Sequence, residues 1–402
     1  MDTSSSTDTR PGRLVRQGRG NATYWAFVPG PLPPTLVLDL EVVRALDAAS
    51  RAVGELSGLA RSLPNPFLFV NPLIRREAVA SSRIEGTEAD LDDLYALEAG
   101  QHIPPGMAAK AGQDLREVLN YVTALDHGLR RLSGFPLSLR LIREIHGLLM
   151  GGVRGEHGAP GEFRRSQNWI GPPGCTLSEA TYVPPPVSEM QECLGALESY
   201  LHTPHDYPSL VRLALVHYQF EAIHPFVDGN GRIGRLLVSL LAVHWGLVPQ
   251  PLLHVSSYFE QRRPDYYDGL LAVSTRGAWR EWVLLFLNAV RAQATDTNRR
   301  VKRLQDLQVR WQERIRHARA SASLVSLVDR LFETPLLTVR SAQRALDLRT
   351  HRGAKLNVDK LLDYGILRLW GQQSGESVYT ADEIFEVLRQ EPPDPDDTEP
   401  AD

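Results

Sequence analysis

The apolar residues of this chain recur mainly at intervals of three and four positions, the spacing that gives a helix one buried face. This spacing first appears at Leu38, Leu40, Val43, Leu46 and Ala49. Similar stripes follow over residues 112–132, 137–150, 187–202, 207–223, 231–245 and 279–292. The pattern therefore predicts an all-α fold class with a helical core.

Strand patterns are sparse by comparison. Residues 168–186 (NWIGPPGCTLSEATYVPPP) are rich in Gly and Pro and have short apolar edges at Trp169–Ile170 and Tyr182–Val183. Such a segment predicts a small β-hairpin or an extended flap rather than part of a larger sheet.

The two ends of the chain lack apolar periodicity. Residues 1–22 are polar, and residues 390–402 form an acidic, proline-rich tail. Neither segment can bury enough apolar surface to fold, so both are predicted to be disordered.

The remaining pattern divides the interior into four regions. We expect an N-terminal helical region at 23–110 and a core at 111–292. An arginine-rich linker helix follows at 293–320, with one apolar face at Leu304, Leu307, Trp311 and Ile315. Residues 321–389 then give three helices, a strand, a Gly-containing turn and a strand, which is the order of a winged-helix module.

Composition excludes several classes of protein. The 402 residues contain 44 Lys+Arg and 48 Asp+Glu, so the whole chain has no basic signature of nucleic-acid binding. Its two cysteines are too few for a disulfide scaffold or a zinc ribbon. We find neither a signal-peptide pattern at the start nor an apolar run long enough to span a bilayer. A cytoplasmic protein without membrane association is expected.

The segment with the clearest chemistry is HPFVDGNGRIGR, residues 224–235. Its glycines fit G-x-G-x-x-G, but a dinucleotide-binding fold requires a preceding strand and an acid about 20 residues later. Residues 209–223 before it have helical spacing, and PQPLLH follows without an acid. The dinucleotide fold is therefore disfavoured.

The same segment predicts a helix, a tight turn and a second helix. Pro225 ends the first helix near Ile223, and the second begins near Asn230. The start of that helix, with Arg232 and Arg235 on one side, forms an anion site suited to polyphosphate. Nearby, Asp228 offers a hard oxygen ligand for Mg²⁺, and His224 could act as a base. Taken singly, each of these residues could instead have only a structural role.

HPFVDGNGRIGR resembles the signature of the Fic family, HPFx(D/E)GNGRxxR. Every fixed position is matched, at His224, Pro225, Phe226, Asp228, Gly229, Asn230, Gly231, Arg232 and Arg235. The resemblance implies a protein adenylyltransferase with an all-α, Fic-type helical core and a hairpin flap, which moves AMP from ATP to a hydroxyl side chain of a target protein.

By this resemblance His224 is the catalytic base, and Asp228 holds the Mg²⁺ cofactor. The nucleotide-binding residues of the motif are Gly229, Asn230, Gly231, Arg232, Ile233, Gly234 and Arg235. Outside the motif, the resemblance adds Thr181 and Tyr182 of the flap, and the pair Tyr266 and Tyr267, which contacts the base. Many family members have Asn where this chain has Ser274. His217 is predicted to be a structural helix histidine.

A second stretch, EAVASSRIEGT at residues 77–87, predicts a helix that stops at Gly86. Glu85 then lies in the last turn, where the helix dipole disfavours a carboxylate by roughly 0.3–1 kcal/mol. The stretch resembles the inhibitory motif (S/T)xxxE(G/N) of the family, matched by Ser81, Glu85 and Gly86. The resemblance implies that Glu85 pairs with Arg235 and excludes the γ-phosphate of ATP. The same glutamate could instead orient a water that removes AMP.

The partners remain partly open. Residues 179–183 match the family's flap, which binds the target protein by strand addition. Residues 338–355 have a local charge of +4 (Arg340, Arg344, Arg349, Arg352 and Lys355 against Asp347), so the module at 321–389 could bind DNA or a protein. The alternative function is a DNA-binding transcriptional regulator that uses the nucleotide site as a sensor. A homodimer is also expected.

Overall fold

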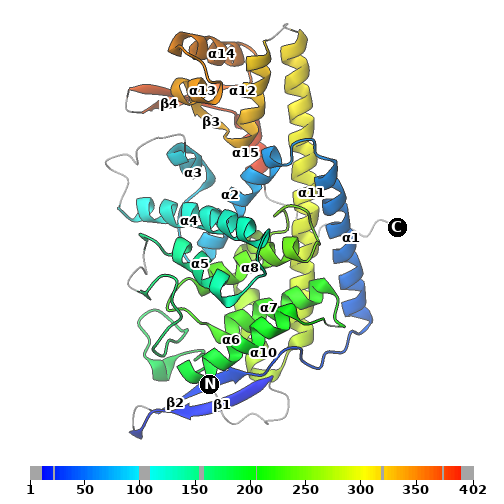
Figure 1. Cartoon of the computed structure of the whole chain (residues 1–402), viewed down its shortest axis with the longest axis vertical. Helices are drawn as coiled ribbons and strands as arrows, with labels where there is room; N and C mark the ends of the chain where they lie inside the picture. The colour runs from blue at the N-terminus through cyan, green and yellow to red at the C-terminus, as the bar shows by residue number, and fades with distance from the viewer. Residues whose placement is uncertain are drawn as a thin grey trace.

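The computed structural model describes residues 11–20, 23–98, 109–153, 158–204, 206–317, 321–373 and 375–390. Within these ranges helices dominate, and the strands form two small antiparallel sheets, so the predicted all-α fold class is confirmed (Figure 1). The helices are α1 (Leu40–Ser62), α2 (Phe67–Ile84), α3 (Leu91–Glu98), α4 (Ala109–Leu132), α5 (Leu139–Leu149), α6 (Val187–His202), α7 (Ser209–Ile223), α8 (Asn230–His244), α9 (Ser256–Gln261), α10 (Arg263–Arg276), α11 (Trp279–His317), α12 (Ala322–Glu333), α13 (Val339–Ala345), α14 (His351–Asp363) and α15 (Asp382–Arg389). The strands are β1 (Gly12–Gln17), β2 (Tyr24–Pro29), β3 (Leu336–Thr338), β4 (Arg368–Gln373) and β5 (Glu376–Thr380).

Helices α7 and α8 form the centre of the core. Nearly every side chain of α7 is buried, including Leu213, Leu215 and Phe220, because its sequence is apolar around the whole circumference. It packs against α6, α10 and α11, whereas α8 packs against α4, α5 and α2. The short turn between α7 and α8 therefore lies among most of the helices of the core.

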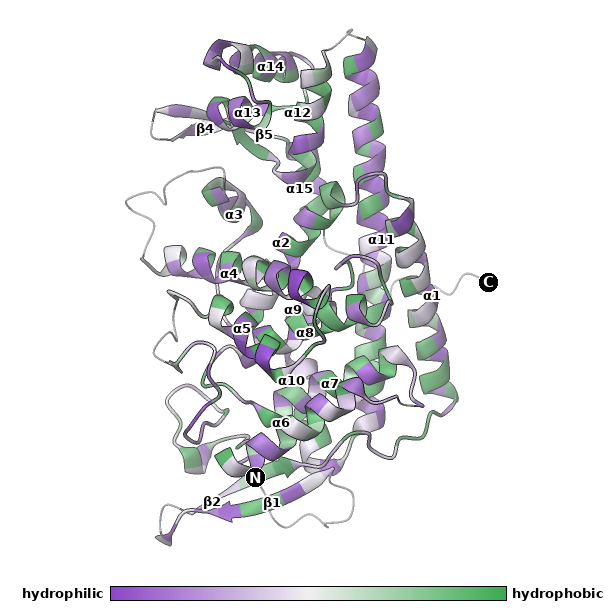
Figure 2. Cartoon of the chain, in the orientation of Figure 1, coloured by the Kyte–Doolittle hydropathy of each residue, from purple (hydrophilic) through white to green (hydrophobic). Residues whose placement is uncertain are grey.

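Helix α11 continues through the predicted boundary between residues 292 and 293. Residues 279–317 contain no Gly or Pro, and buried residues continue along one side from Val290 through Val301 to Ile315. In Figure 2 the part of α11 toward the C-terminal elements is mainly purple, interrupted by green. The predicted linker helix is thus part of one helix, because the change in composition marks a change of surroundings and not the end of an element.

Helix α1 was predicted correctly as a helix, but only part of its predicted apolar stripe is buried. Leu40 is 65% exposed and Val43 is 45% exposed, whereas the predicted Ala49 is fully buried together with Val42 and Leu56. The buried stripe is set by packing of α1 along α11, where Asn298 Nδ2 donates to Ala52 O at 3.3 Å.

Strand β1 lies within the segment predicted to be disordered, so that prediction is wrong for Gly12–Gln17. The strand pairs antiparallel with β2. Further contacts hold this hairpin against the core: Arg13 forms a 2.6 Å ion pair with Glu189, and Phe27 N–H donates to Val183 O at 2.8 Å. These partners are distant in sequence, so local periodicity could not predict the strand. Of the predicted disordered ends, residues 1–10, 21–22 and 391–402 lie outside the described residues.

The predicted flap at residues 168–186 is reduced to one β-bridge, between Ile170 and Tyr182. Between these residues the chain forms a single 3-10 turn, Leu177–Glu179, whose start is capped by Thr176. The side chains of Trp169 and Ile170 are each 42% exposed. The flap is therefore a loop whose two ends are joined by the bridge between Ile170 and Tyr182, and its side chains at Trp169 and Ile170 are exposed to solvent.

The C-terminal elements follow the predicted order of three helices and a hairpin, namely α12, α13 and α14, then β4 and β5. Strand β3 and helix α15 are additional, and the sheet order is β3-β5-β4. Two of the predicted cations have acidic neighbours, since Arg340 lies 3.9 Å from Glu376 and Lys355 pairs with Asp359. The winged-helix assignment and the DNA-binding role of this region stay predictions.

None of the helices in the described ranges has both the length and the apolar character needed to cross a membrane.

Arg300 joins α11 to the end of α15, and its loss is expected to destabilise the protein. Its buried guanidinium pairs with Asp296 at 2.7 Å and donates to the carbonyl oxygens of Val387, Leu388 and Gln390. We expect Arg300→Ala to lower the free energy of unfolding by about 3 kcal/mol, because it leaves buried acceptors unpaired. Urea titration measures this change. Arg303→Ala, at an exposed position of the same helix, is the control and should change stability by less than about 0.5 kcal/mol. Equal effects of the two variants would contradict the prediction.

Candidate active site

The turn between α7 and α8 is built from residues in unusual backbone conformations. His224, directly after α7, has a left-handed backbone (φ 49°, ψ 61°), and Gly229 caps α8 with φ 80°. The side chain of Asn230 closes the turn, since its Oδ1 accepts from Phe226 N–H and its Nδ2 donates to Phe226 O, both at 2.9 Å. The predicted helix boundaries are confirmed, but the amide of Asn230 is used inside the turn. Any contact of this residue with a phosphate would come from its backbone N–H.

A buried histidine fixes the other side of the turn. His146 of α5 stacks on Phe226 with a centroid distance of 3.7 Å and an interplanar angle of 3°. Its Nδ1 accepts from Gly161 N–H at 2.9 Å, so Nε2 carries the proton and donates to Asp228 O at 3.0 Å. Burial lowers the pKa of His146 to about 4, so its imidazole is neutral at pH 7. The position of Asp228 therefore depends on a residue that the sequence analysis did not identify.

Arg164 ties the same turn to the flap. Its guanidinium is buried and donates to His224 O at 3.0 Å, to Ser166 O at 3.1 Å and to Pro185 O at 2.5 Å. Burial lowers the pKa of Arg164 to about 10. Because the acceptors lie on two separate segments, one side chain sets the distance between the flap and His224. No motif in the sequence predicted this role.

The side chain of His224 faces a cavity with one ring nitrogen available. Nδ1 lies 3.3 Å from Glu221 O, and because a carbonyl can only accept, Nδ1 carries the proton and Nε2 has the lone pair. Burial lowers the pKa of His224 to about 4, so the imidazole is neutral at pH 7. Nε2 can therefore accept a proton from a bound hydroxyl group.

Glu85 and Arg235 meet in the structure, although they are 150 positions apart. The carboxylate Oε1 of Glu85 accepts from Arg235 Nη2 at 2.7 Å, while Ser81 accepts from Arg235 Nε through its Oγ at 3.0 Å and from Nη2 through its backbone O at 2.9 Å. Burial raises the pKa of Glu85, but the charge and hydrogen bond of Arg235, together with the charges of Arg232 and His224, outweigh it, so the net pKa is lowered. Helix α2 ends directly before Glu85, and Gly86 follows with φ 91°, as predicted.

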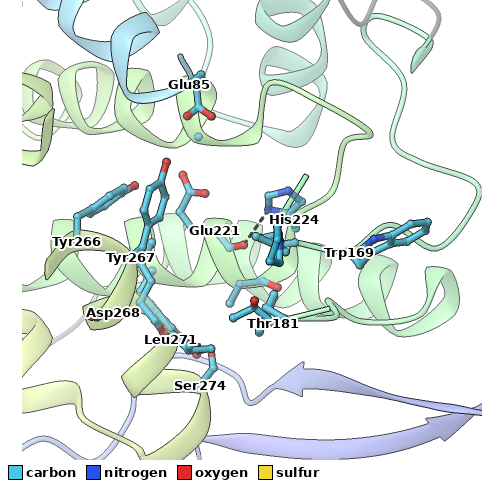
Figure 3. Close-up of a pocket in the computed structure, with 18 of the residues that line it drawn as sticks. Glu85, Trp169, Thr181, Glu221, His224, Tyr266, Tyr267, Asp268, Leu271 and Ser274 are labelled. Carbon is cyan, nitrogen blue, oxygen red and sulfur yellow. Dashed lines mark hydrogen bonds between the residues drawn. The ribbon is translucent and has the colours of Figure 1, made fainter. Parts of the chain in front are cut away.

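These residues surround a cavity of about 590 Å³ (Figure 3). Glu85 lies beside Gly231 and Arg235 at one end, and in Figure 3 Leu271 and Ser274 lie on the side away from Glu85, with Tyr267 and His224 between them. The flap contributes Thr181 and Tyr182, and the hydroxyl of Tyr182 donates to Ala222 O at 2.7 Å. One end of the cavity is polar and includes helix N–H groups without intrahelical acceptors, and the rest is apolar and aromatic. This combination suits a ligand that has an anionic part and a planar part.

The two predicted tyrosines differ in what they offer to such a ligand. Tyr266 also lines the cavity but is 1% exposed, and its hydroxyl is hydrogen-bonded to His217 Nε2 at 3.0 Å. Tyr267 is 44% exposed and remains accessible from the cavity. The hydroxyl of Ser274 is likewise paired, with Tyr218 OH at 2.9 Å. Tyr267 is therefore the aromatic side chain best placed to stack on a planar ring.

Other predicted site residues do not line the cavity. Arg232 is buried and directed to Glu117 at 3.1 Å, with Asp228 Oδ1 at 3.6 Å. Ile233 is fully buried in the core. The remaining predicted residues that are not among those lining the cavity are Ser81, Gly86, Asp228, Gly229, Asn230 and Gly234. The glutamate that faces Arg232, Glu117, is 115 positions away, which is why sequence spacing alone did not reveal the pair.

The residues around Asp228 fit a magnesium ion held jointly with phosphates. The Asp228 side chain is 50% exposed, and its Oδ1 accepts from Gly229 N–H at 2.5 Å. Among the described residues there is no cluster of three or more acidic, His or Cys side chains that could hold a metal by itself. A single accessible carboxylate beside a helix N-terminus matches the way Mg²⁺ is bound together with a polyphosphate.

Comparison with known families gives two matches. The model described as Fic/DOC family N-terminal matches residues 43–130, which include Glu85, and the model described as Fic/DOC family matches residues 136–242, which include His224 and Arg235.

Similar curated proteins match over part of the chain. It is 34% identical over 149 residues to "Protein adenylyltransferase Fic" of Aedes aegypti and 35% identical over 150 residues to the protein of the same name in Culex quinquefasciatus. Each match covers 37% of this chain and 26% of the relative, so the chain spans about a quarter of the length of the curated relatives it matches.

Solved structures share the fold over a longer stretch. A Fic family protein from Desulfovibrio desulfuricans G20 superposes with a TM-score of 0.56 at 20% identity, covering 87% of this chain and 98% of that one. A Fic domain containing signaling protein from Bacteroides thetaiotaomicron has a TM-score of 0.51 at 18% identity, covering 63% and 94%. These likenesses show a common helical architecture.

The buried His217 is expected to make the protein sensitive to acid. Burial lowers its pKa to about 3, whereas an unfolded histidine titrates near about 6.5. The unfolded chain therefore takes up a proton that the folded chain excludes, and stability is lost as the pH falls below about 6.5. Between pH 7 and pH 5 we expect this residue to remove about 2 kcal/mol. Urea unfolding of the wild type and His217→Gln at both pH values measures the difference, and parallel pH profiles would contradict it.

Proposed function

Because the chain belongs to the Fic/DOC family through residues 43–130 and 136–242, we propose that it is a protein adenylyltransferase. It transfers AMP from ATP to a hydroxyl side chain of a target protein. The names of the relatives at about a third identity support this activity. The observation that carries the proposal is the arrangement of His224, Arg235 and Glu85 around one cavity that also has an aromatic end.

In the proposed reaction, Nε2 of His224 takes the proton of the target hydroxyl. The hydroxyl oxygen attacks the α-phosphorus of ATP, the bond from that phosphorus to the oxygen bridging to the β-phosphorus breaks, and diphosphate leaves. The neutral state and the tautomer of His224 support this role. Since transfer of this kind depends mostly on positioning and on stabilisation of charge, the contacts of Arg164 with the backbone of His224 contribute by fixing the base.

The phosphates are held by the first turn of α8 and by Arg235. Backbone N–H groups at a helix N-terminus lack intrahelical acceptors and attract anions. Arg232 would have to leave Glu117 to reach a phosphate, so we assign the outer phosphates to Arg235 and keep Arg232 as a support for Asp228. Asp228 would hold Mg²⁺, which when bound neutralises charge on the phosphates.

Glu85 acts as an intramolecular inhibitor in this proposal. Its carboxylate is hydrogen-bonded to the guanidinium group of Arg235, which the γ-phosphate of ATP requires. A carboxylate and a phosphate bound to the same side of Arg235 would repel each other. The Glu85 side chain is still 35% exposed, so its release does not require unfolding of the core. The target protein would align with the flap at residues 179–183, whose neighbouring outer edge at Trp169 and Ile170 is exposed.

Removal of the inhibitory carboxylate is expected to activate the enzyme. We expect Glu85→Gly to raise labelling of the protein itself with α-labelled ATP by roughly 10-fold or more, since Arg235 becomes free to bind a phosphate. Glu88→Gly, three positions further on and exposed, is the matched control and should label like the wild type. Unchanged labelling in Glu85→Gly would refute the inhibitory role, while a mass increase of one AMP per modified hydroxyl supports the reaction.

Loss of His224 is expected to remove the activity without loss of the fold. In the Glu85→Gly background, His224→Ala should lower the rate of AMP transfer by roughly 10²- to 10⁴-fold, the usual contribution of a general base. Because the base acts in its neutral form, the rate of the parent should fall as the pH drops through about 4. Circular dichroism confirms folding. Full labelling of His224→Ala would exclude the mechanism, and salt-sensitive duplex binding without any label would favour a DNA-binding regulator.

A further inference from the structure

Glu221 is a half-buried acid in the cavity that the mechanism above does not use. It lies on α7, three positions before His224, and lines the same cavity. Its Oε1 is closed off from solvent and has no hydrogen-bond partner among the described residues. A carboxyl group with one buried, unpaired oxygen costs folding free energy, so its presence calls for a reason other than stability. Because the residue is only half-buried, its other oxygen, Oε2, is the one that a ligand in the cavity can reach.

The backbone of α8 makes room for this carboxyl group. A Cβ atom at Gly234 would overlap Oε1 of Glu221, just as a Cβ atom at Gly231 would overlap Oε1 of Glu85. The two glycines are three positions apart and therefore lie on one side of α8. The carboxyl groups of Glu221 and Glu85 therefore lie side by side on this surface of α8, but only Glu85 is hydrogen-bonded to Arg235.

Charge neutralisation of Arg235 does not explain Glu221. Burial raises the pKa of Glu221 to about 8, with Arg235 opposing this rise and Glu85 adding to it. The charged groups that act on it are therefore Arg235 from α8 and Glu85 from the end of α2. At neutral pH the carboxyl group is mostly protonated, and it can both donate and accept a hydrogen bond.

The position of Glu221 indicates which part of a nucleotide it meets. In Figure 3 its side chain lies between Tyr267 and His224, below Glu85. The phosphates belong at the end with Glu85 and Arg235, and the base belongs toward the opposite, apolar side with Leu271, so the sugar lies between them. A phosphate oxygen is anionic and only accepts, whereas a sugar hydroxyl both donates and accepts, as a protonated carboxyl group does.

We propose that Glu221 determines the specificity of the site for a ribonucleotide by hydrogen bonding to a hydroxyl group of the ribose. This proposal rests on the proposed function, since it takes ATP as the substrate. It gives a reason for an otherwise unfavourable group: Oε1 stays packed against Gly234, and binding of the sugar at Oε2 supplies a partner to a carboxyl group that has none among the described residues. A site that hydrogen-bonds a substrate hydroxyl rejects an analogue without it, because the buried group is then left unpaired.

The test compares ATP with 2′-deoxy-ATP and 3′-deoxy-ATP. Binding is measured by calorimetry in the inactive Glu85→Gly, His224→Ala protein, and transfer is measured in Glu85→Gly. We expect ATP to be preferred over at least one deoxynucleotide by roughly 10- to 100-fold in both measurements. Glu221→Leu should abolish this preference by weakening ATP alone, and Glu221→Gln, which keeps a hydrogen-bonding group, should restore part of it.

Asp268 provides a matched control, because it is an exposed carboxylate that lines the same cavity. Asp268→Leu should keep the preference for ATP; loss of the preference in this variant and not in Glu221→Leu would overturn the assignment. Without nucleotide, Glu221→Leu should melt at the same temperature as the parent or higher, and a lower melting temperature would identify Glu221 as a structural residue. ATP binding without any AMP transfer would refute the proposed function but leave the sugar preference measurable.

Discussion

The buried guanidinium of Arg235 is the group on which the rest of the site depends. It is 1% exposed, and the hydrogen bonds that it makes within the described part of the chain go to the end of α2, at Ser81 and Glu85. A buried cation needs both charge compensation and hydrogen bonds. Helix α2 supplies both, so the N-terminal region is joined to α8 at the same place where a substrate anion would bind. The proposed inhibition and the packing of the N-terminal region against α8 therefore depend on the same contact.

A second buried acid secures α2 in this position. Glu77, one turn before Ser81, accepts hydrogen bonds from the backbone and side chain of Ser256 and lies 3.4 Å from the hydroxyl of Tyr121. Burial raises the pKa of Glu77 to about 7. On its other side α2 packs against α12, where Phe69 and Phe332 have ring centroids 5.9 Å apart. The helix that presents Glu85 thus lies between the core and the C-terminal elements, and it contacts both.

Much of the site consists of groups that position others. His146 and Arg164 contact the backbone of the turn and leave its cavity-facing side chains in place. Asn230 and Arg232, which a motif suggests as ligands, have their side chains engaged in the turn and with Glu117. Fewer residues of the motif can therefore contact a substrate than its sequence suggests. Glu221, which lies outside the motif, also lines the cavity.

The sequence alone determined the local features. The helices α7 and α8, the turn at His224 and the end of α2 at Glu85 follow from periodicity, Pro225 and the glycines, because these act on neighbouring residues through backbone geometry. The partner of Arg235 was expected only from a family resemblance. Tertiary structure decided the rest: the strand β1, the buried face of α1, the pairing of Arg232 with Glu117 and the isolation of Glu221. Each of these depends on segments far apart in the chain, whose meeting is fixed by helix packing and not by local spacing.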